Sequence, residues 1–315
     1  MTRLPWSDRV ESLVGTMREG MTRATLSLFE HAPYPLEHTR DHPGDPGLLG
    51  PESVSWRLLA DPAAFVGGLR GLLIQAAHPE VVAGVGDHSR YRDDPFGRLS
   101  RTSAYVTATT FGSMPEVEAA VRQVQRIHRV VRGVSSRGVP YDAADPGFSA
   151  WVHNVLTDSF LAANQAYGGY PLSAGDSDRF VLEQTRIGAL LGADPMPSTA
   201  EGLASWVAGH PEVALSPEMT DVVDFLTDPP MRPALKIGYA ALLEAAVTIV
   251  PDRLRELLGL RRKPGAELMG RAAVGSLRWA LGYSPSWALA LERTGAEIPE
   301  EMFRQVPGAR LRAAS

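Results

Sequence analysis

The stretch PFGRLSRTSAYVTATTFGSMPEVEAAVRQVQRIHRVVRG, residues 95–133, predicts two consecutive helices from which the rest of the chain can be interpreted. The first helix begins after Pro95 and ends near Gly112. Five of its polar residues fall at the three- and four-residue spacing that places side chains on one face; they are Arg98, Arg101, Thr102, Tyr105 and Thr109. Cations and hydroxyl groups on one stripe are unusual, because a helix face is normally either apolar or solvent-exposed. This stripe is therefore a candidate functional surface.

The second helix has a clear beginning and one unusual polar residue. Ser113-Met-Pro-Glu116 is a capping box with proline in the first turn, where its missing N–H costs nothing. Val117, Val121 and Val124 then recur at helical spacing, and His128 falls in register with them. An imidazole that points toward a core must find partners for both ring nitrogens, and a metal is one such partner. A buried histidine that only forms hydrogen bonds is the alternative, and the spacing does not decide between them.

Composition bounds the classes of function. The chain has 315 residues, 44% of them hydrophobic, a formal net charge of −5 and no cysteine. This length supports a large core, and the charge provides no global basic field, so we expect no nucleic-acid partner. Without cysteine there can be no disulfide, thiolate metal ligand, iron–sulfur cluster or cysteine nucleophile. Any metal must therefore be held by histidine, carboxylate or tyrosine.

The sequence predicts no membrane span. Its most apolar stretch, residues 237–250, is too short to cross a bilayer and contains Glu244. The first residues lack the apolar run of a secretory signal. We therefore expect a cytoplasmic location.

An apolar helix is predicted before residues 95–133. It begins at Asp61-Pro62 and contains Gly67, Gly68 and Gly71, whose small size would allow another helix or a flat ligand to approach closely. The residue before a proline disfavours helical geometry, so His78 before Pro79 predicts a break between this helix and the next.

A third helix of interest begins at Asp145-Pro146. His153, Thr157 and Phe160 share one of its faces, which makes His153 the rival to His128 as a metal ligand and adds Thr157 to the candidate cofactor-binding residues. The alternative for His153 is a hydrogen bond to a carboxylate such as Asp158 or to a backbone carbonyl.

No stretch shows the alternation of a strand, and we expect the segment from Gly133 to Tyr141 to be a loop. Glycine-rich nucleotide motifs and the nucleophile elbow of Ser-His-Asp hydrolases are absent. The prediction is an all-α protein with one large helical domain at residues 51–290. An N-terminal helix and loop arm at residues 1–50 would precede it, and a tail at residues 291–315 would follow.

The chain resembles the rubber-oxygenase family, which includes the latex-clearing proteins and the MpaB-type oxygenases. The resemblance covers roughly residues 50 to 285. It is carried by LLIQAAHP (residues 72–79), Asp94-Pro95, Arg98-x-x-Arg101-Thr102, Phe111-Gly112, His128-x-x-Val131-x-Gly133, Pro140-Tyr141, Asp145-Pro146 and Trp151-Val152-His153.

This resemblance implies a globin-like helical core, with additional flanking helices, that binds haem b. It implies His128 as the iron ligand and Arg98, Arg101 and Thr102 as distal residues. The latex-clearing proteins have lysine where this chain has Arg101, and a guanidinium stays protonated and cannot bind iron. We therefore expect an open or water-occupied sixth position on the iron.

Several assignments remain open within the resemblance. The family's distal glutamate has no clear match here, and Glu80 and Asp87 are the nearest acidic residues. Arg98 and Arg101 could bind haem propionates or form surface ion pairs with Asp93 and Asp94. Tyr105 could line the haem pocket or only pack.

The expected function is a haem b-dependent oxygenase or oxidoreductase that uses O₂. Its expected substrate is a small apolar molecule, such as an unsaturated or isoprenoid-like one, and the reaction could cleave a carbon–carbon double bond. The first alternative is a non-catalytic haem-binding carrier or gas-binding protein, and the second is a haem-free helical binding module. The oligomeric state is not predicted.

Overall fold

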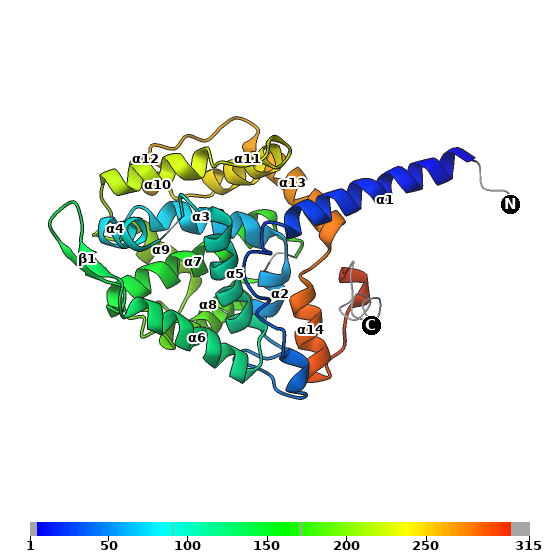
Figure 1. The fold of residues 1–315 in the computed structure, drawn as a ribbon, viewed down its shortest axis with the longest axis horizontal. Helices are drawn as coiled ribbons and strands as arrows, with labels where there is room; N and C mark the ends of the chain where they lie inside the picture. Colours follow the sequence, from blue (N-terminus) through cyan, green and yellow to red (C-terminus); the bar gives the residue numbers. More distant parts are fainter. Residues whose placement is uncertain (1–4, 90, 171, 304–315) are drawn as a thin grey trace.

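The computed structural model describes residues 5–89, 91–170 and 172–303, and within them the fold is predominantly helical, as predicted (Figure 1). The helices are α1 (Pro5–Leu26), α2 (Val54–Ala60), α3 (Ala63–Gln75), α4 (Pro79–His88), α5 (Pro95–Phe111), α6 (Met114–His128), α7 (Pro146–Tyr167), α8 (Ala174–Ala189), α9 (Ala200–Gly209), α10 (Pro217–Thr227), α11 (Pro233–Thr248), α12 (Asp252–Leu257), α13 (Ala266–Leu281) and α14 (Pro285–Thr294). Two short 3₁₀ helices lie at Thr39–Asp41 and Glu300–Met302. The globin-like arrangement of the core stays a prediction.

Residues next to the helix ends set the beginning of α6 and the break between α3 and α4. The predicted capping box before α6 is present, with the Glu116 carboxylate accepting a hydrogen bond from the Ser113 N–H at 2.9 Å. The break at His78-Pro79 is also confirmed: α3 ends at Gln75, His78 has extended backbone geometry, and Pro79 begins α4.

The packing of α3 against α7 forms the centre of the body. Gly67 and Gly71 face α7, and a Cβ atom added at Gly67 would lie only 2.9 Å from the Cα of Phe160. A Cβ atom added at Gly68 would meet nothing within 4 Å. Two of the three glycines therefore permit a close helix–helix approach, which is one of the two roles expected for them.

A buried ion pair crosses the same interface. The Arg70 guanidinium lies 2.7 Å from the Asp158 carboxylate, and these side chains are 3% and 8% exposed. Arg70 also donates to the Ser159 hydroxyl at 2.8 Å and to the Ile249 carbonyl at 2.9 Å. Because the two charges compensate each other and the Arg70 guanidinium is also hydrogen-bonded, the pair fixes how α3 and α7 align, and it connects both to the end of α11.

The segment before α2 is joined to the body by Arg293 of α14. The buried Arg293 guanidinium donates to the Thr39 hydroxyl at 2.6 Å, to the Phe111 carbonyl at 2.7 Å and to the Asp45 carbonyl at 2.8 Å. It therefore connects the arm, the end of α5 and α14. Helix α1 extends outward from the body (Figure 1). Its Thr22 hydroxyl donates to the Ala280 carbonyl at the end of α13.

The prediction that the chain has no strand is wrong in one place. Arg132–Val134 (β1) pairs in an antiparallel manner with Pro140–Asp142 (β2), and the hairpin lies at the end of the body opposite α1 (Figure 1). Strands of three residues are too short to show an alternating pattern, so the sequence suggested a loop. The hairpin is held by Tyr141, which is buried against Gly84 of α4 and whose hydroxyl donates to Asp87 at 2.5 Å.

Among the described residues, no single helix is long and apolar enough to cross a bilayer. Helices α2 and α3 reach that length and composition together, but they meet at an angle of 90°.

The α3–α7 interface predicts different outcomes for two adjacent glycines. Gly67→Ala should lower the free energy of unfolding by about 1 to 3 kcal/mol, because the added methyl group has no room against Phe160. Gly68→Ala is the matched control on the same helix, and it should raise stability by up to about 1 kcal/mol. Urea denaturation followed by circular dichroism measures both values. Equal effects at the two positions would contradict the close approach.

Candidate functional site

The predicted polar stripe on α5 divides into an exposed part, a partly buried part and the fully buried Thr109. Arg101 is 51% exposed, and its guanidinium lies 3.2 Å from the carboxylate of Asp94, which also caps α5 by accepting from the Gly97 N–H. Thr102 is exposed beside it. For Arg101 the structure thus shows the surface ion pair that the sequence left open as an alternative, and such pairs contribute little to stability.

Among the residues that the structure describes, three polar side chains within residues 95–133 lack a polar partner, unlike Arg101. Within the described residues, the Arg98 guanidinium, the Tyr105 hydroxyl and the His128 imidazole have no hydrogen bond or ion pair, although each side chain is partly buried. Of the three, the Tyr105 hydroxyl is fully buried, and buried polar groups without partners are uncommon in folded proteins, so this one needs an explanation. A bound ligand is one such explanation.

Burial also sets the charge states of these groups. It lowers the pKa of His128, which a nearby carboxylate at Asp142 opposes, so the imidazole favours the neutral form that binds metals. Burial raises the pKa of Tyr105, so its hydroxyl keeps its proton at neutral pH and can donate a hydrogen bond. Burial lowers the pKa of the Arg98 guanidinium, whose intrinsic value is nevertheless high enough for it to remain cationic.

The structure places His153 and Thr157 on α7 in a different environment. The His153 Nε2 donates to the Gln184 carbonyl of α8 at 2.8 Å, and the Thr157 hydroxyl donates to the His153 carbonyl at 2.9 Å. This is the backbone-carbonyl alternative stated from the sequence. Burial lowers the pKa of His153 to about 4. A Cβ atom added at Gly188 would lie 2.7 Å from the imidazole, so the ring is closely packed against α8.

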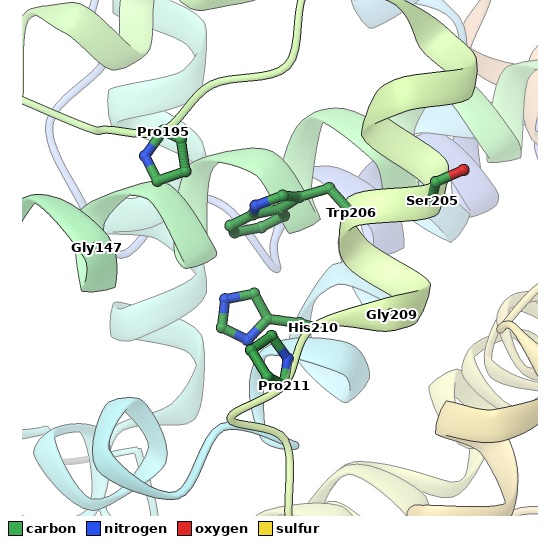
Figure 2. Close-up of a pocket in the computed structure, with 7 residues that line it drawn as sticks. All are labelled: Gly147, Pro195, Ser205, Trp206, Gly209, His210 and Pro211. Atoms are coloured by element: carbon green, nitrogen blue, oxygen red, sulfur yellow. The ribbon is translucent and has the colours of Figure 1, made fainter.

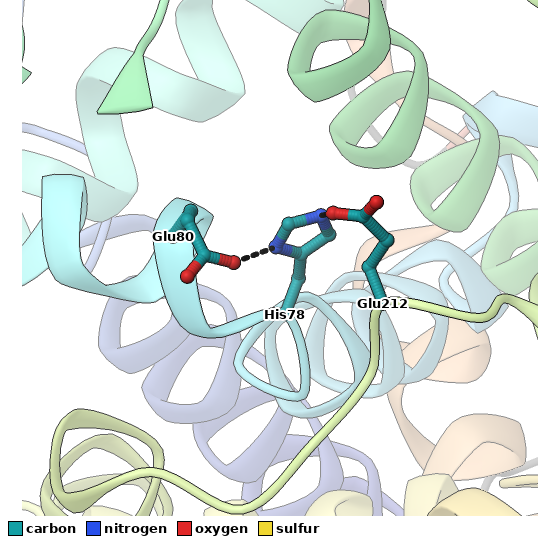
Figure 3. A group of neighbouring side chains, drawn as sticks. All are labelled: His78, Glu80 and Glu212. Atoms are coloured by element: carbon teal, nitrogen blue, oxygen red, sulfur yellow. Dashed lines mark ion pairs between the residues drawn. The ribbon is translucent and has the colours of Figure 1, made fainter. Parts of the chain in front are cut away.

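A second polar cluster, which was not predicted as a site, lies where α3 ends and α4 begins. His78 precedes α4, Glu80 lies in its first turn, and Glu212 lies in the segment between α9 and α10 (Figure 3). The His78 Nδ1 is 3.5 Å from a Glu80 oxygen, and its Nε2 is 3.6 Å from a Glu212 oxygen. His78 and Glu80 are 2% and 1% exposed, whereas Glu212 is 56% exposed. Burial lowers the pKa of His78 to about 4.

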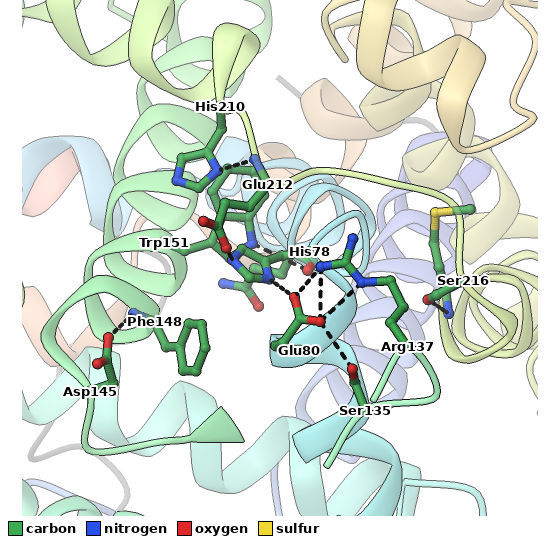
Figure 4. Close-up of polar contacts among 12 residues, drawn as sticks. His78, Glu80, Ser135, Arg137, Asp145, Phe148, Trp151, His210, Glu212 and Ser216 are labelled. Atoms are coloured by element: carbon green, nitrogen blue, oxygen red, sulfur yellow. Dashed lines mark hydrogen bonds and ion pairs between the residues drawn. The ribbon is translucent and has the colours of Figure 1, made fainter. Parts of the chain in front are cut away.

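The hairpin between β1 and β2 orients Glu80. Arg137 donates to Glu80 through Nε at 3.1 Å and through Nη2 at 2.9 Å, and the Ser135 hydroxyl donates at 3.0 Å (Figure 4). The buried carboxylate is thus paired with a cation and hydrogen-bonded, which offsets the cost of its desolvation.

Aromatic rings surround His78 and lead to a cavity. The His78 ring contacts those of Phe148, Trp151 and His210, with centroids 5.4 to 5.7 Å away. His210 also lines a cavity of about 300 Å³, together with Trp206, two prolines, two glycines and Ser205 (Figure 2). This is near the lower end of the volumes of small-molecule sites.

One part of this cluster was visible in the sequence. The sequence predicts a helix break at His78, and Glu80 is one of the two acidic residues nearest to the expected distal side. Glu212 is far away in sequence and carries no motif, so only the fold brings it to His78.

The described residues fit a haem in their donor chemistry. His128 provides a neutral imidazole without a protein partner, Arg98 an uncompensated cation that suits a propionate, and Tyr105 a buried hydroxyl that lacks an acceptor. No hydrogen bond or ion pair connects these three residues to one another in the described part of the chain.

Comparison with known proteins gives a family match over most of the chain. The model of the family described as "ER-bound oxygenase mpaB/B'/Rubber oxygenase, catalytic domain" matches residues 56–279. Uncharacterized proteins of Mycobacterium bovis and Mycobacterium tuberculosis are each 29% identical over 124 residues, which is 38% of this chain and 48% of each relative. The chain thus spans about half the length of the curated relatives it matches. No solved structure matches significantly.

The low pKa of His153 predicts a pH dependence of stability. The folded-state value of about 4 lies below the ordinary 6.5, so the unfolded chain binds the additional proton and stability is lost as the pH falls between these values. Between pH 7.5 and pH 4.5, His153 should account for a loss of about 2 to 3 kcal/mol. Urea denaturation at both pH values should show His153→Gln losing less stability than the parent protein by this amount. His38→Gln, at a side chain that is 73% exposed, is the control and should match the parent. An unchanged loss in His153→Gln would contradict the buried neutral imidazole.

Proposed function

Because the chain belongs to the family of the ER-bound oxygenase mpaB/B' and rubber oxygenase catalytic domains, we propose that the protein is an oxygenase, an enzyme of the oxidoreductase class. The family model covers residues 56–279, which include α3 to α12 and nearly all of α13. The match supports O₂ as one reactant and a second molecule as the substrate that is oxidised.

The cofactor in this proposal is haem b, with His128 as the iron ligand. The observation that carries it is the set of partly buried polar groups without protein partners at Arg98, Tyr105 and His128. His153 is a weaker candidate, because its Nε2 already donates to a backbone carbonyl and its ring is closely packed. When bound, haem iron with one histidine ligand supplies an open position for O₂.

The protein's own residues would bind and orient the reactants. Arg98 would hold an anionic group, either a propionate or a polar oxygen of a reactant, through charge-assisted hydrogen bonds. Tyr105 would donate a hydrogen bond from a hydroxyl that stays protonated at neutral pH. Arg101 and Thr102 are exposed here, so a distal role for them would require that face to be covered.

The substrate in this proposal is a small apolar molecule, such as an unsaturated or isoprenoid-like one. The support is the family description, which names rubber oxygenase, and rubber is an unsaturated hydrocarbon polymer. A cytoplasmic location remains part of the proposal.

Replacing the proposed iron ligand should remove the haem signal. We expect the protein expressed with ample haem to show a Soret absorbance band and His128→Ala to lose most of it, because no other imidazole in the opening stretch can replace the ligand. His153→Gln is the control and should keep the band. Absorption spectra of oxidised and reduced protein, with and without CO, measure this.

Two results would contradict this assignment. A parent protein without a Soret band under these conditions would exclude haem, and a band lost in His153→Gln but kept in His128→Ala would move the ligand to α7. Reversible O₂ binding without oxidation of any unsaturated substrate would instead favour the haem carrier or gas-binding alternative.

A further inference from the structure

The imidazole of His78 lies between two carboxylates that do not satisfy it. Glu80 faces Nδ1 at 3.5 Å and Glu212 faces Nε2 at 3.6 Å, and both distances are longer than ordinary hydrogen bonds (Figure 3). The side chain of His78 is 2% exposed, and its Nδ1 has no hydrogen-bond partner. Solvent therefore does not compensate for the missing bond.

A neutral imidazole cannot resolve this arrangement by itself. It carries one N–H group, so it can donate to only one of the two carboxylates, and its other nitrogen directs a lone pair at the oxygens of the second. A positive charge on the ring, or one bound to a ring nitrogen and faced by both carboxylates, removes the conflict. The candidates are a second proton on the ring and a metal ion.

We propose that His78, Glu80 and Glu212 bind a divalent transition-metal cation at a site separate from the proposed haem site. One nitrogen of His78 and one oxygen from each glutamate already lie within 4.8 Å of one another. Metal–ligand bonds of about 2.0 to 2.2 Å in a tetrahedral site would require separations of roughly 3.4 Å. Glu80 lies beside Nδ1 and Glu212 beside Nε2, and an ion binds only one ring nitrogen, so one carboxylate must also turn toward the nitrogen that holds the ion. Glu212 can make this movement, because its side chain is 56% exposed in the segment between α9 and α10.

Hydrogen bonds from neighbouring residues orient the Glu80 carboxylate, as is usual for a metal ligand. One of its oxygens accepts hydrogen bonds from Ser135 and from Nε of Arg137, and the other faces His78 and also accepts from Nη2 of Arg137 (Figure 4). Metal-binding carboxylates are usually oriented by such outer hydrogen bonds. The two carboxylates and the Arg137 guanidinium leave one uncompensated negative charge beside a neutral His78, so a cation remains favoured.

The donor set indicates which metals fit. One imidazole and two carboxylates suit Zn²⁺, Mn²⁺ or Fe²⁺, and the absence of thiolates disfavours Cu⁺. Three protein ligands leave at least one coordination position for water or another small ligand. The ring of His210, which packs against His78, also contacts Trp206 and lines the cavity with it.

Calorimetric titration of the full-length, chelator-treated protein with ZnCl₂ tests the proposal. We expect one ion per chain, and we expect Glu212→Gln to weaken the affinity by at least about tenfold, because an amide is a far poorer ligand than a carboxylate. Glu118→Gln, at a surface glutamate that is 58% exposed, is the matched control and should bind like the parent. Titration with CoCl₂ should give visible absorption bands that Glu212→Gln reduces.

The haem variant separates this site from the proposed oxygenase centre. His128→Ala should keep the Zn²⁺ affinity of the parent, whether or not it loses the Soret band. Glu80→Gln tests the second carboxylate, and circular dichroism shows whether this variant is folded. If Glu80→Gln does not fold, Glu212→Gln still tests the site, because its side chain lies at the surface.

Three outcomes would overturn the proposal. The first is a parent protein that binds no Zn²⁺ or Co²⁺ at concentrations up to about 100 µM. The second is Glu212→Gln binding as tightly as the parent, and the third is His128→Ala losing Zn²⁺ binding.

Discussion

The close approach of α3 and α7 is the constraint on which the rest of the structure depends. Gly67 and Gly71 let the two helices come closer than side chains would allow, and the buried Arg70–Asp158 pair sets their alignment. Further along the interface, the Trp151 indole donates to the Gln75 carbonyl. His78 follows the end of α3 and therefore packs against aromatic rings of α7. The position of this histidine thus depends on the packing of α3 against α7 at Gly67 and Gly71.

Three histidines that look alike in the sequence have different surroundings in the fold. His153 donates to a backbone carbonyl, His78 lies between two carboxylates, and His128 has no protein partner among the described residues. Burial lowers the pKa of all three, so the loss of solvent alone does not distinguish them. The neighbouring hydrogen-bond acceptors decide which histidine can bind a ligand. A histidine that donates to a good acceptor is satisfied, and one without such an acceptor can bind a ligand or a metal.

Much of the fold and part of the site could be predicted from local signals. The capping box at Ser113 and the break before Pro79 lie where the sequence predicted, because both depend on residues within one helical turn. The hairpin containing Tyr141 was missed, because three-residue strands leave no pattern and are held by α4. The helical spacing places the polar residues of α5 on one stripe, but it does not show that Arg101 faces solvent and Arg98 is half-buried.

The sequence by itself determined the helical class, the main helix boundaries, the absence of thiolate chemistry and the family, because these depend on composition and on residues close together in the chain. Only the tertiary structure decided which polar side chains have partners and which do not. It brought Glu212, from the segment after α9, to the imidazole of His78 at the start of α4. Whether a side chain is satisfied depends on groups from distant segments, and the helical spacing of a single segment contains no information about them.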